Sequence, residues 1–279
     1  VTAFKSGQID TMSQPSPSTI EALQDDPEAV VKTTLTGRTD VLRMRADMDP
    51  WSDNRVRTAL KLCQDRQRIL DLAVFGNGVV GQDHHVAPVH PEYCEIETPE
   101  YDPERAKALL EEAGFPDGLE FDLSVSSGRD PHVTFAETLK ETAAEAGFTI
   151  NIKTMPEKQY GQQWTEHVVG ITSWGHRPLA MMVLPLAYGC EDGELAAWNE
   201  SHWCNEEFSE VLREAQATVE LEDRRELTCQ LETIQQQEGT VGIPYWRNTP
   251  GVIRSTFKGY QVHPSAYDIF YRVWHDESA

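Results

Sequence analysis

Apolar residues between positions 53 and 72 recur at the spacing of one helix face. A capping side chain, Asp53 or Ser52, precedes the first of them, and the pattern continues through Leu72. The buried face is predicted to consist of Val56, Ala59, Leu60 and Cys63. The segment 53–72 is therefore predicted to be helical and amphipathic.

A strand–helix–strand pattern occupies the middle of the chain. Residues 119–125 and 148–152 alternate between apolar and polar side chains, as half-buried strands do. Residues 132–146, between them, have helical periodicity instead. Two strands joined through a helix pair in parallel, so the fold class is predicted to be α/β.

Shorter patterns complete the prediction. A further helix is expected at 102–114, with Asp102 as its cap, Pro103 in its first turn and Gly114 at its end. The remaining expected elements are a short helix at 18–24 capped by Ser18, extended segments at 30–34 and 40–45, a short helix at 157–164, strands at 168–174, 241–246 and 267–274, and helices at 205–219 and 222–238.

The net charge of the chain argues against some classes of binding partner. The 46 acidic and 24 basic residues give a net charge of −22. Such a surface repels phosphate backbones and anionic headgroups, so we expect no nucleic-acid partner and no direct membrane insertion. The glycine-rich stretch at 76–81 lacks the Gly-Lys-Ser/Thr of a phosphate-binding loop, and no catalytic set emerges. We therefore expect a protein that is not an enzyme and needs no cofactor.

The five cysteines form no C-x-x-C motif. Cys63 and Cys229 fall within helical patterns and are expected to be buried apolar residues. Cys190 and Cys204 bracket a polar, loop-like stretch, and in an oxidising compartment they can close a short loop. They are the candidate disulfide.

Several segments carry a family resemblance through their order and spacing. Together they resemble the C-terminal part of a family 5 extracellular solute-binding protein of ABC transporters, the group that binds oligopeptides, dipeptides or nickel. The resemblance covers nearly the whole chain. The segments are Gly7 to Asp10, Asp53 to Leu60, Tyr101 to Phe115, Trp174 to Pro178, Asn205 to Ala215, Ile243-Pro244 and Gly259 to Pro264.

The resemblance implies a periplasmic-binding-protein-like fold of class II, large cluster C type. In that fold two α/β lobes are joined by two crossing strands and trap solute between them. Residues 1–34 would end the main segment of the first lobe, 35–248 would form the second lobe, and 249–279 would return to the first. The chain would then hold the second lobe plus an incomplete first lobe, as a fragment or a clipped protein.

An incomplete first lobe would leave apolar side chains uncovered. We therefore expect the chain to self-associate, or to pair with the remaining part of the protein, through these residues. They are Ile9, Val252, Ile253, Phe257, Phe270 and Trp274.

The resemblance also implies where solute binds. Peptide-binding members hold the peptide amine with an Asp four residues before a loop proline, but Trp174 occupies that place here, with His176 and Arg177 following before Pro178. Arg177 offers a planar fork for a carboxylate or phosphate, and Trp174 offers an aromatic face. The alternative is that Arg177 pairs with an acidic side chain and Trp174 fills the core.

Four further residues are candidates for solute contact. Trp198 and Asn199 resemble a pair that rims the cleft, and Asn199 can donate and accept hydrogen bonds at once. His84 is expected to reach the solute from across the cleft, while Trp246 is either a wall of the site or part of the core. His84, His85 and His90 with Asp83 also form the one His-rich cluster of the sequence, which leaves a metal site open.

These residues imply the solute-binding component of an ABC importer. It would capture a small solute, anionic or peptide-like, and deliver it to the permease subunits. It would act in the periplasm or tethered at the cell surface. The alternatives are a metal or metal-chelate carrier of the same family and, from another class, a carboxylate-dependent hydrolase.

Overall fold

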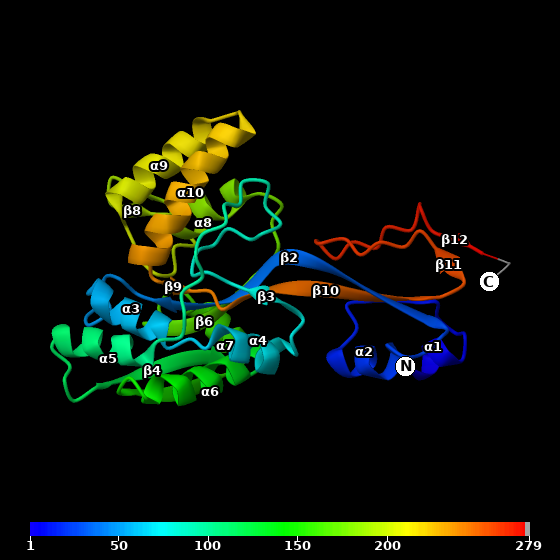
Figure 1. Cartoon of the computed structure of the whole chain (residues 1–279), viewed down its shortest axis with the longest axis horizontal. Helices are drawn as coiled ribbons and strands as arrows, with labels where there is room; N and C mark the ends of the chain where they lie inside the picture. Colours follow the sequence, from blue (N-terminus) through cyan, green and yellow to red (C-terminus); the bar gives the residue numbers. More distant parts are fainter. Residues whose placement is uncertain (277–279) are drawn as a thin grey trace. The chain divides into compact units, whose positions relative to one another are not determined.

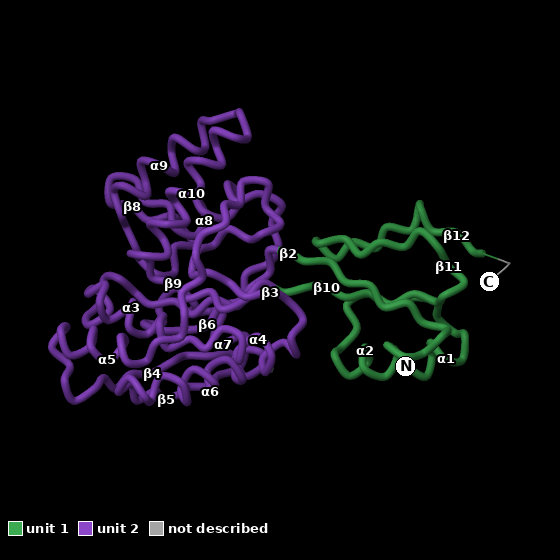
Figure 2. Tube along the Cα trace, in the orientation of Figure 1, with its two compact units in different colours: residues 1–36, 247–279 green, residues 37–246 purple. Residues whose placement is uncertain are grey.

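The computed structural model describes residues 1–276. Contacts divide the chain into two compact units, residues 1–36 with 247–279 as unit 1 and residues 37–246 as unit 2 (Figure 2). These divisions lie close to the boundaries expected after residues 34 and 248. Among the described residues, no helix has the length and apolar character needed to cross a membrane.

Unit 2 is built on a mixed sheet. Strand β4 (Leu119–Ser126) pairs in parallel with β5 (Phe148–Met155), as the strand–helix–strand pattern predicted, and also in parallel with β6 (Val169–Trp174). Strand β6 pairs antiparallel with β2 (Ala29–Met44), which places Thr39 opposite Trp174. The α/β fold class is confirmed.

Strand β2 is continuous where two separate extended segments were expected. Residues between those segments stay in the ladder because β2 pairs with β10 (Tyr245–Arg254). Hydroxyl groups reinforce this pairing: Thr36 donates to the Arg247 carbonyl and Thr39 to the Tyr245 carbonyl, each at 2.7 Å. The expected strand at 241–246 is interrupted, because β9 (Val241–Gly242) ends before Pro244, which has no N–H to donate.

The predicted helix at 53–72 is two helices, α3 (Asn54–Leu62) and α4 (Arg66–Val74). Asp53 caps α3 by accepting from the Arg55 N–H at 2.8 Å. A second cap, Asp65, accepts from the Arg68 N–H at 3.0 Å and starts the new helix. The continuous apolar periodicity hid this break.

The remaining helices of unit 2 flank the sheet or extend from it (Figure 1). Helix α4 packs on α6, α3 packs on α5, and α9 packs on α10. Their bounds, with the short strands of this unit, are β3 (Gly78–Val80), α5 (Pro103–Glu112), α6 (Asp130–Ala144), α7 (Glu157–Gln162), a 3-10 turn (Ala180–Met182), α8 (Leu184–Tyr188), β7 (Cys190–Glu191), β8 (Glu194–Leu195), α9 (Glu206–Ala217) and α10 (Leu221–Glu238).

One hydrophobic core joins the sheet of unit 2 to its helices. Phe135 of α6, Leu60 of α3 and Leu42 of β2 are each fully buried within it. Trp51 meets Phe121 of β4 edge to face, with ring centroids 4.9 Å apart. This core anchors the strand ends that carry the site described below.

Unit 1 has a small core of its own, formed by Phe4, Leu23 and Val252. The unit comprises α1 (Thr2–Lys5), β1 (Thr11–Ser13), α2 (Pro17–Leu23), β11 (Phe257–Lys258), β12 (Trp274–His275) and the outer parts of β2 and β10. The cap of α2 is Ser16, whose side chain accepts from the Thr19 N–H, and not the expected Ser18.

Two expectations for the end of the chain need correction. The predicted strand at 267–274 is irregular until β12 begins at Trp274. Of the side chains expected to be uncovered, Val252 and Ile253 are buried: β1 pairs with β10 alongside them, and Val252 packs with Phe4 and Leu23. Ile9, Phe270 and Trp274 are exposed, and Phe257 is half-buried. Self-association through these residues stays a prediction.

Both disulfides of the structure lie in unit 2. Cys190 and Cys204 pair as expected, with Cα atoms 5.4 Å apart. Cys94 pairs with Cys229, Cα to Cα 5.2 Å, so the prediction that Cys229 is an unpaired apolar residue was wrong. Helical periodicity places Cys229 on α10 but cannot show that Cys94, in an irregular segment, lies against it. Cys63 is buried and free, as predicted.

Candidate functional site

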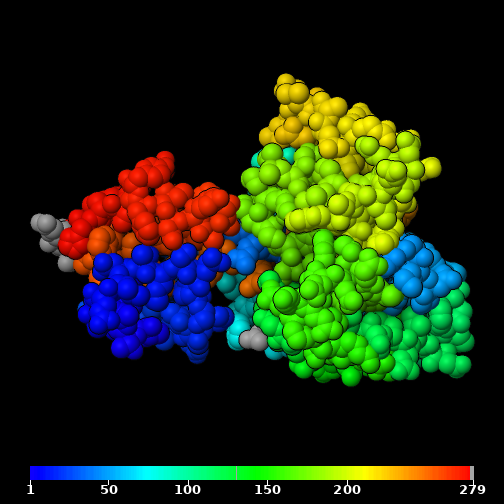
Figure 3. Space-filling model, turned by 180° about the vertical axis from the view of Figure 1, so that it is seen from behind, coloured from blue at the N-terminus to red at the C-terminus, as the bar shows by residue number. Residues whose placement is uncertain are grey.

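A pocket of about 790 Å³ lies entirely within unit 2. Its lining comes from the C-terminal end of β6, the start of α6, α7 with the segment after it, and the loop between β8 and α9. Figure 3 shows a face of unit 2 on which residues 120–165 (green) and residues 170–200 (yellow-green) come to the surface. The larger and polar side chains of this lining are Arg129, His132, Glu157, Tyr160, Trp164, Thr172, Ser173, Trp174, His176, Arg177 and Trp198.

Arg177 lies against two tryptophans of this lining. Its guanidinium carbon is 5.4 Å from the centroid of Trp174 and 5.6 Å from that of Trp198, within the range of cation–π attraction. Its Nη1 donates a long hydrogen bond to the Gly175 carbonyl, at 3.5 Å. Among the described residues no carboxylate forms an ion pair with Arg177. Burial lowers the pKa of Arg177, although a guanidinium stays protonated in proteins.

Three tryptophans enclose the same side of the pocket. Trp198 meets Trp164 and Trp174 at centroid distances of 5.8 Å, both edge to face. Trp174 is 5% exposed, whereas Trp198 is 44% exposed. Trp174 therefore forms the floor beneath the guanidinium, and Trp198 offers a free face at the rim.

The floor tryptophan is held by a buried carboxylate. Glu200 accepts a hydrogen bond from Trp174 Nε1 at 2.8 Å and one from Thr172 Oγ1 at 2.7 Å. Arg43 of β2 donates to the same carboxylate from Nε at 3.1 Å, and both side chains are almost fully buried. Burial raises the pKa of Glu200, against the opposing effect of Arg43 and the two other donors.

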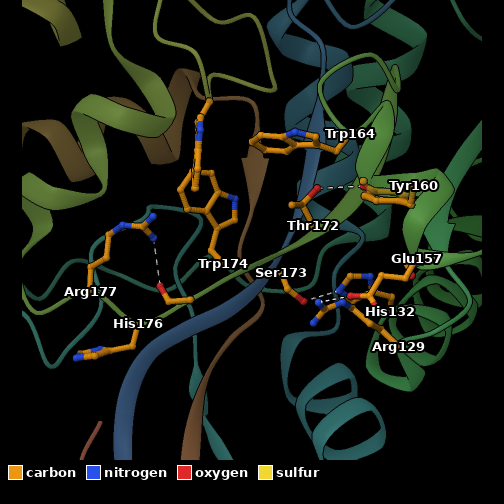
Figure 4. A pocket seen from close by; sticks show the side chains of 14 residues that line it. Arg129, His132, Glu157, Tyr160, Trp164, Thr172, Ser173, Trp174, His176 and Arg177 are labelled. Atoms are coloured by element: carbon orange, nitrogen blue, oxygen red, sulfur yellow. Dashed lines mark hydrogen bonds and ion pairs between the residues drawn. The ribbon is translucent and has the colours of Figure 1, made fainter. Parts of the chain in front are cut away.

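The opposite side of the pocket carries a polar network (Figure 4). His132 Nε2 lies 2.8 Å from Ser173 Oγ and 3.1 Å from Asp40 Oδ1. Ser173 Oγ also donates to Asp40 Oδ1, and the Tyr245 hydroxyl donates to Asp40 Oδ2 at 2.7 Å. A nucleophile triad needs the acid on the second ring nitrogen of the histidine, whereas here serine and acid share one nitrogen. The network orients side chains and does not resemble a hydrolase site.

An ion pair stands at the rim on that same side. Arg129 Nη2 lies 2.5 Å from Glu157 Oε1, and the two side chains are 43% and 56% exposed. Glu157 is the one carboxylate among the described residues that line the pocket. The pocket thus offers two guanidinium groups and one carboxylate to a ligand, in a protein whose net charge is strongly negative.

The structure brings four of the seven sequence-predicted site residues together at the pocket: Trp174, His176, Arg177 and Trp198. His176 is half-buried, and its Nδ1 accepts from the Gly37 N–H at 3.0 Å. A Cβ at Gly37 would lie 3.0 Å from His90 Nε2 and 3.4 Å from His176 Nδ1, so both histidines pack tightly against this part of β2. His176 therefore fixes the loop after β6 to strand β2.

The other three predicted residues do not line the pocket. Asn199 is buried and organises its own loop: its Nδ2 donates to the Trp203 carbonyl at 2.8 Å, and its Oδ1 accepts from the Trp203 N–H at 3.3 Å. His84 is fully buried, with its Nε2 3.7 Å from Glu232. Trp246 is fully buried beside His85, at a ring distance of 5.8 Å. Trp246 is therefore part of the core and not a wall of the site.

The His-rich cluster does not converge. Among the described residues, no three His, Cys, Asp or Glu side chains are arranged to hold a metal ion. His85 Nδ1 meets the Tyr188 hydroxyl at 2.8 Å, and His90 Nε2 donates to the Arg177 carbonyl at 3.0 Å. Burial lowers the pKa of His84 to about 3 and that of His90 to about 4, so both are neutral at neutral pH.

Sequence reasoning missed Arg43, Glu200 and Trp164. The sequence has 46 acidic residues, and nothing in the local sequence separates Glu200 from the exposed ones. Arg43 offered a weak signal, since it lies in a strand whose neighbouring side chains are apolar. Trp164 follows a short helix whose packing the sequence did not reveal.

Comparison with known proteins places the chain in a family. The family model for bacterial extracellular solute-binding proteins, family 5 Middle, matches residues 1–193. The chain is 25% identical to di/tripeptide-binding protein 1 of Pseudomonas aeruginosa over 280 residues, which is 97% of this chain and 51% of that protein. It is also 25% identical over 280 residues to heme-binding protein A of Haemophilus influenzae, covering 97% of this chain and 50% of that protein.

A solved structure agrees with this placement. HbpA2 from Haemophilus parasuis has the same fold, with a TM-score of 0.85 at 22% identity, over 98% of this chain and 55% of that one. The chain spans about half the length of the curated relatives it matches. The family's description and the relatives' names are those of binding proteins that work outside the cytoplasm, not of enzymes. The chain belongs to the bacterial extracellular solute-binding proteins of family 5.

Proposed function

We propose that this chain supplies the solute-contacting pocket of an ABC importer's binding protein, and that the solute is small and peptide-like with an anionic group. The pocket's Arg177 binds that anionic group. The protein acts in the periplasm or tethered at the cell surface and delivers its solute to the permease subunits. Membership of the family supports the transport role, and the pocket chemistry supports the solute class.

One observation carries the proposal: Arg177 lies in a pocket, on two aromatic faces, with no ion-pair partner among the described carboxylates. A protein with such an excess of acidic residues has many carboxylates available to a free arginine. A guanidinium that is left without one, and is partly desolvated, gains most from a ligand carboxylate. Each charged hydrogen bond formed there contributes about 1.5–3 kcal/mol.

The remaining lining fits a zwitterionic solute. Trp174 stands where peptide-binding relatives are expected to carry the acid that holds the peptide amine, so this chain needs another acceptor. Glu157 lies across the pocket from Arg177 and is half exposed (Figure 4). In this proposal the carboxylate of the solute binds Arg177, its amine binds Glu157, and the indole of Trp198 covers an apolar side chain between them.

A fluorescence titration tests the proposal. The dipeptide Ala-Phe is added to the chain while tryptophan emission is recorded, since three tryptophans line the pocket. We expect a saturable change in the wild type and weaker binding in Arg177→Ala. An absence of saturable change with Ala-Phe, Ala-Ala and Ala-Glu would overturn the peptide-like solute class. Equal affinity in wild type and Arg177→Ala would remove Arg177 from the site.

A further inference from the structure

We propose that the buried ion pair of Arg43 and Glu200 is a positioning pair that holds all three pocket tryptophans in one arrangement. The inference rests on the proposed function, because it concerns the same pocket. Neither residue touches the pocket lumen, and neither carries out chemistry on a solute. Their role is to fix Trp164, Trp174 and Trp198 before the solute arrives.

Glu200 fixes the floor of the pocket. Its Oε1 accepts from Trp174 Nε1, and its Oε2 accepts from both Thr172 and Arg43. An indole N–H has one donor direction, so this hydrogen bond sets the rotation of the ring. The Trp174 ring in turn sets the plane on which the Arg177 guanidinium lies.

Arg43 fixes the second tryptophan through the main chain. Its Nη2 donates to the Trp164 carbonyl at 2.5 Å, and its Nη1 donates to the His167 carbonyl. The guanidinium passes over Gly170, where a Cβ would lie 3.1 Å from Nη2. One planar fork thus ties the segment after α7 to the carboxylate that holds Trp174, a geometry that lysine cannot reproduce.

Trp198 belongs to the same turn as Glu200. The Glu200 N–H donates to the Trp198 carbonyl at 2.9 Å, and the Cys190–Cys204 disulfide closes the loop that carries both residues. Anchoring Glu200 therefore restrains Trp198 as well. Each of the three tryptophans is thus linked to the ion pair. Trp174 and Trp164 are each linked by one hydrogen bond, and Trp198 lies two residues before Glu200 in the same turn.

The pair is better explained by positioning than by stability. Burying two charges costs desolvation that their attraction often fails to recover, and apolar replacements of similar volume are commonly as stable. The pair can instead raise the affinity for solute, because side chains that are already ordered lose less entropy when solute binds. Besides the contact between its two members, the pair makes four hydrogen bonds, and they reach Trp164, Thr172 and Trp174 of the pocket lining and the neighbouring His167 carbonyl.

The test compares Glu200→Gln with the matched control Glu166→Gln, an exposed member of another arginine pair. Near-ultraviolet circular dichroism and acrylamide quenching report the order and access of the tryptophans without any ligand, and Ala-Phe titration reports binding. We expect Glu200→Gln to lose tryptophan dichroism, to be quenched more readily, and to bind Ala-Phe about tenfold more weakly, as for loss of a charged hydrogen bond. Glu166→Gln should match the wild type.

Trp174→Phe is the second variant, in case Glu200→Gln does not fold. It removes the Nε1 donor while Arg43 and Glu200 stay paired, and we expect increased quenching of the remaining tryptophans and weaker Ala-Phe binding. A folded Glu200→Gln or Trp174→Phe protein with the wild-type order of its remaining tryptophans overturns the positioning role. Wild-type protein that ignores Ala-Phe would instead overturn the proposed function, and the ligand-free measurements would still decide the inference.

Discussion

The guanidinium of Arg177 lies 5.6 Å from the centroid of Trp198, whose ring is the most exposed of the three tryptophans at the pocket. The cation is thus held at the mouth of the site by aromatic faces, and no carboxylate within residues 1–276 forms an ion pair with it. Aromatic faces attract a guanidinium without neutralising it, so its charge stays available to an anionic ligand.

Replacing Arg177 by Ala should weaken the binding of an anionic dipeptide by roughly tenfold or more, the cost of one charged hydrogen bond. The measurement is the dissociation constant of Ala-Glu by isothermal titration calorimetry. Arg213→Ala is the matched control, because Arg213 is an exposed arginine of α9 that does not line the pocket. Equal losses in the two variants would indicate a general charge effect.

Replacing Trp198 by Ala should remove selectivity for an aromatic side chain. An aromatic pair contributes about 0.5–1.5 kcal/mol beyond its buried area, so Ala-Phe should lose several-fold in affinity. Ala-Ala, which has no ring to stack, should bind as it does to the wild type. A parallel loss for both dipeptides would show that Trp198 shapes the site and does not contact the solute side chain.

Removing the Cys190–Cys204 disulfide, by replacing both residues with Ala, should destabilise unit 2. The two cysteines are 14 residues apart, and closing a loop of this size contributes about 3 kcal/mol by restricting the unfolded chain. Urea denaturation of the variant under oxidising conditions measures the change, with the Cys94–Cys229 disulfide left intact as an internal reference. An unchanged midpoint would show that the loop is held by Asn199 and Glu200 alone.

The buried pair of His84 and Glu232 predicts a pH dependence of stability. Burial raises the pKa of Glu232 to about 9 and lowers the pKa of His84 to about 3, so the folded pair holds one proton between these limits. In the unfolded chain the ordinary pKa values are 4.5 and 6.5. Unfolding therefore releases a proton above pH 6.5 and takes one up below pH 4.5, so stability falls on either side of that window.

Glu232→Gln tests this dependence, because glutamine keeps the acceptor for the Cys94 N–H, 3.1 Å away, and cannot ionise. Releasing one proton on unfolding lowers the free energy of unfolding by about 1.4 kcal/mol per pH unit. The wild type should therefore lose about 2 kcal/mol of stability between pH 6.5 and about pH 8. The variant should lose this decline, as measured by urea denaturation at each pH. Parallel curves for the two proteins would contradict the assignment.

The sequence predicted elements whose signals are local. The Asp53 and Asp102 caps and the alternation of β4 and β5 need only neighbouring residues, and the structure has them. The continuity of β2 depends on its pairing with β10, about two hundred positions further along, and apolar patterning carries no trace of it. The break between α3 and α4 at Asp65 could not be predicted, because the apolar residues of the two helices continue one periodic pattern.

The residues of the candidate site also fall into those that the sequence predicts and those that only the structure reveals. The sequence singles out Trp174 because it departs from a family motif, and Arg177 because its guanidinium lies in the same loop; both line the pocket. Glu200 and Arg43 could not be found, because a buried carboxylate is distinguished by its three-dimensional surroundings and not by its neighbours in sequence. His84 was expected to reach the solute, but the structure buries its side chain against Glu232, a contact that the sequence does not reveal.

The central claim, that Arg177 recognises the anionic group of a peptide-like solute, is tested most directly by comparing Ala-Phe with its C-terminal amide. Calorimetry on wild type and Arg177→Ala gives four dissociation constants and hence one coupling energy between the arginine and the carboxylate. We predict that the wild type binds the acid at least about tenfold more tightly than the amide, and that Arg177→Ala does not distinguish them. Equal binding of acid and amide by the wild type, or the same preference in both proteins, would contradict the account.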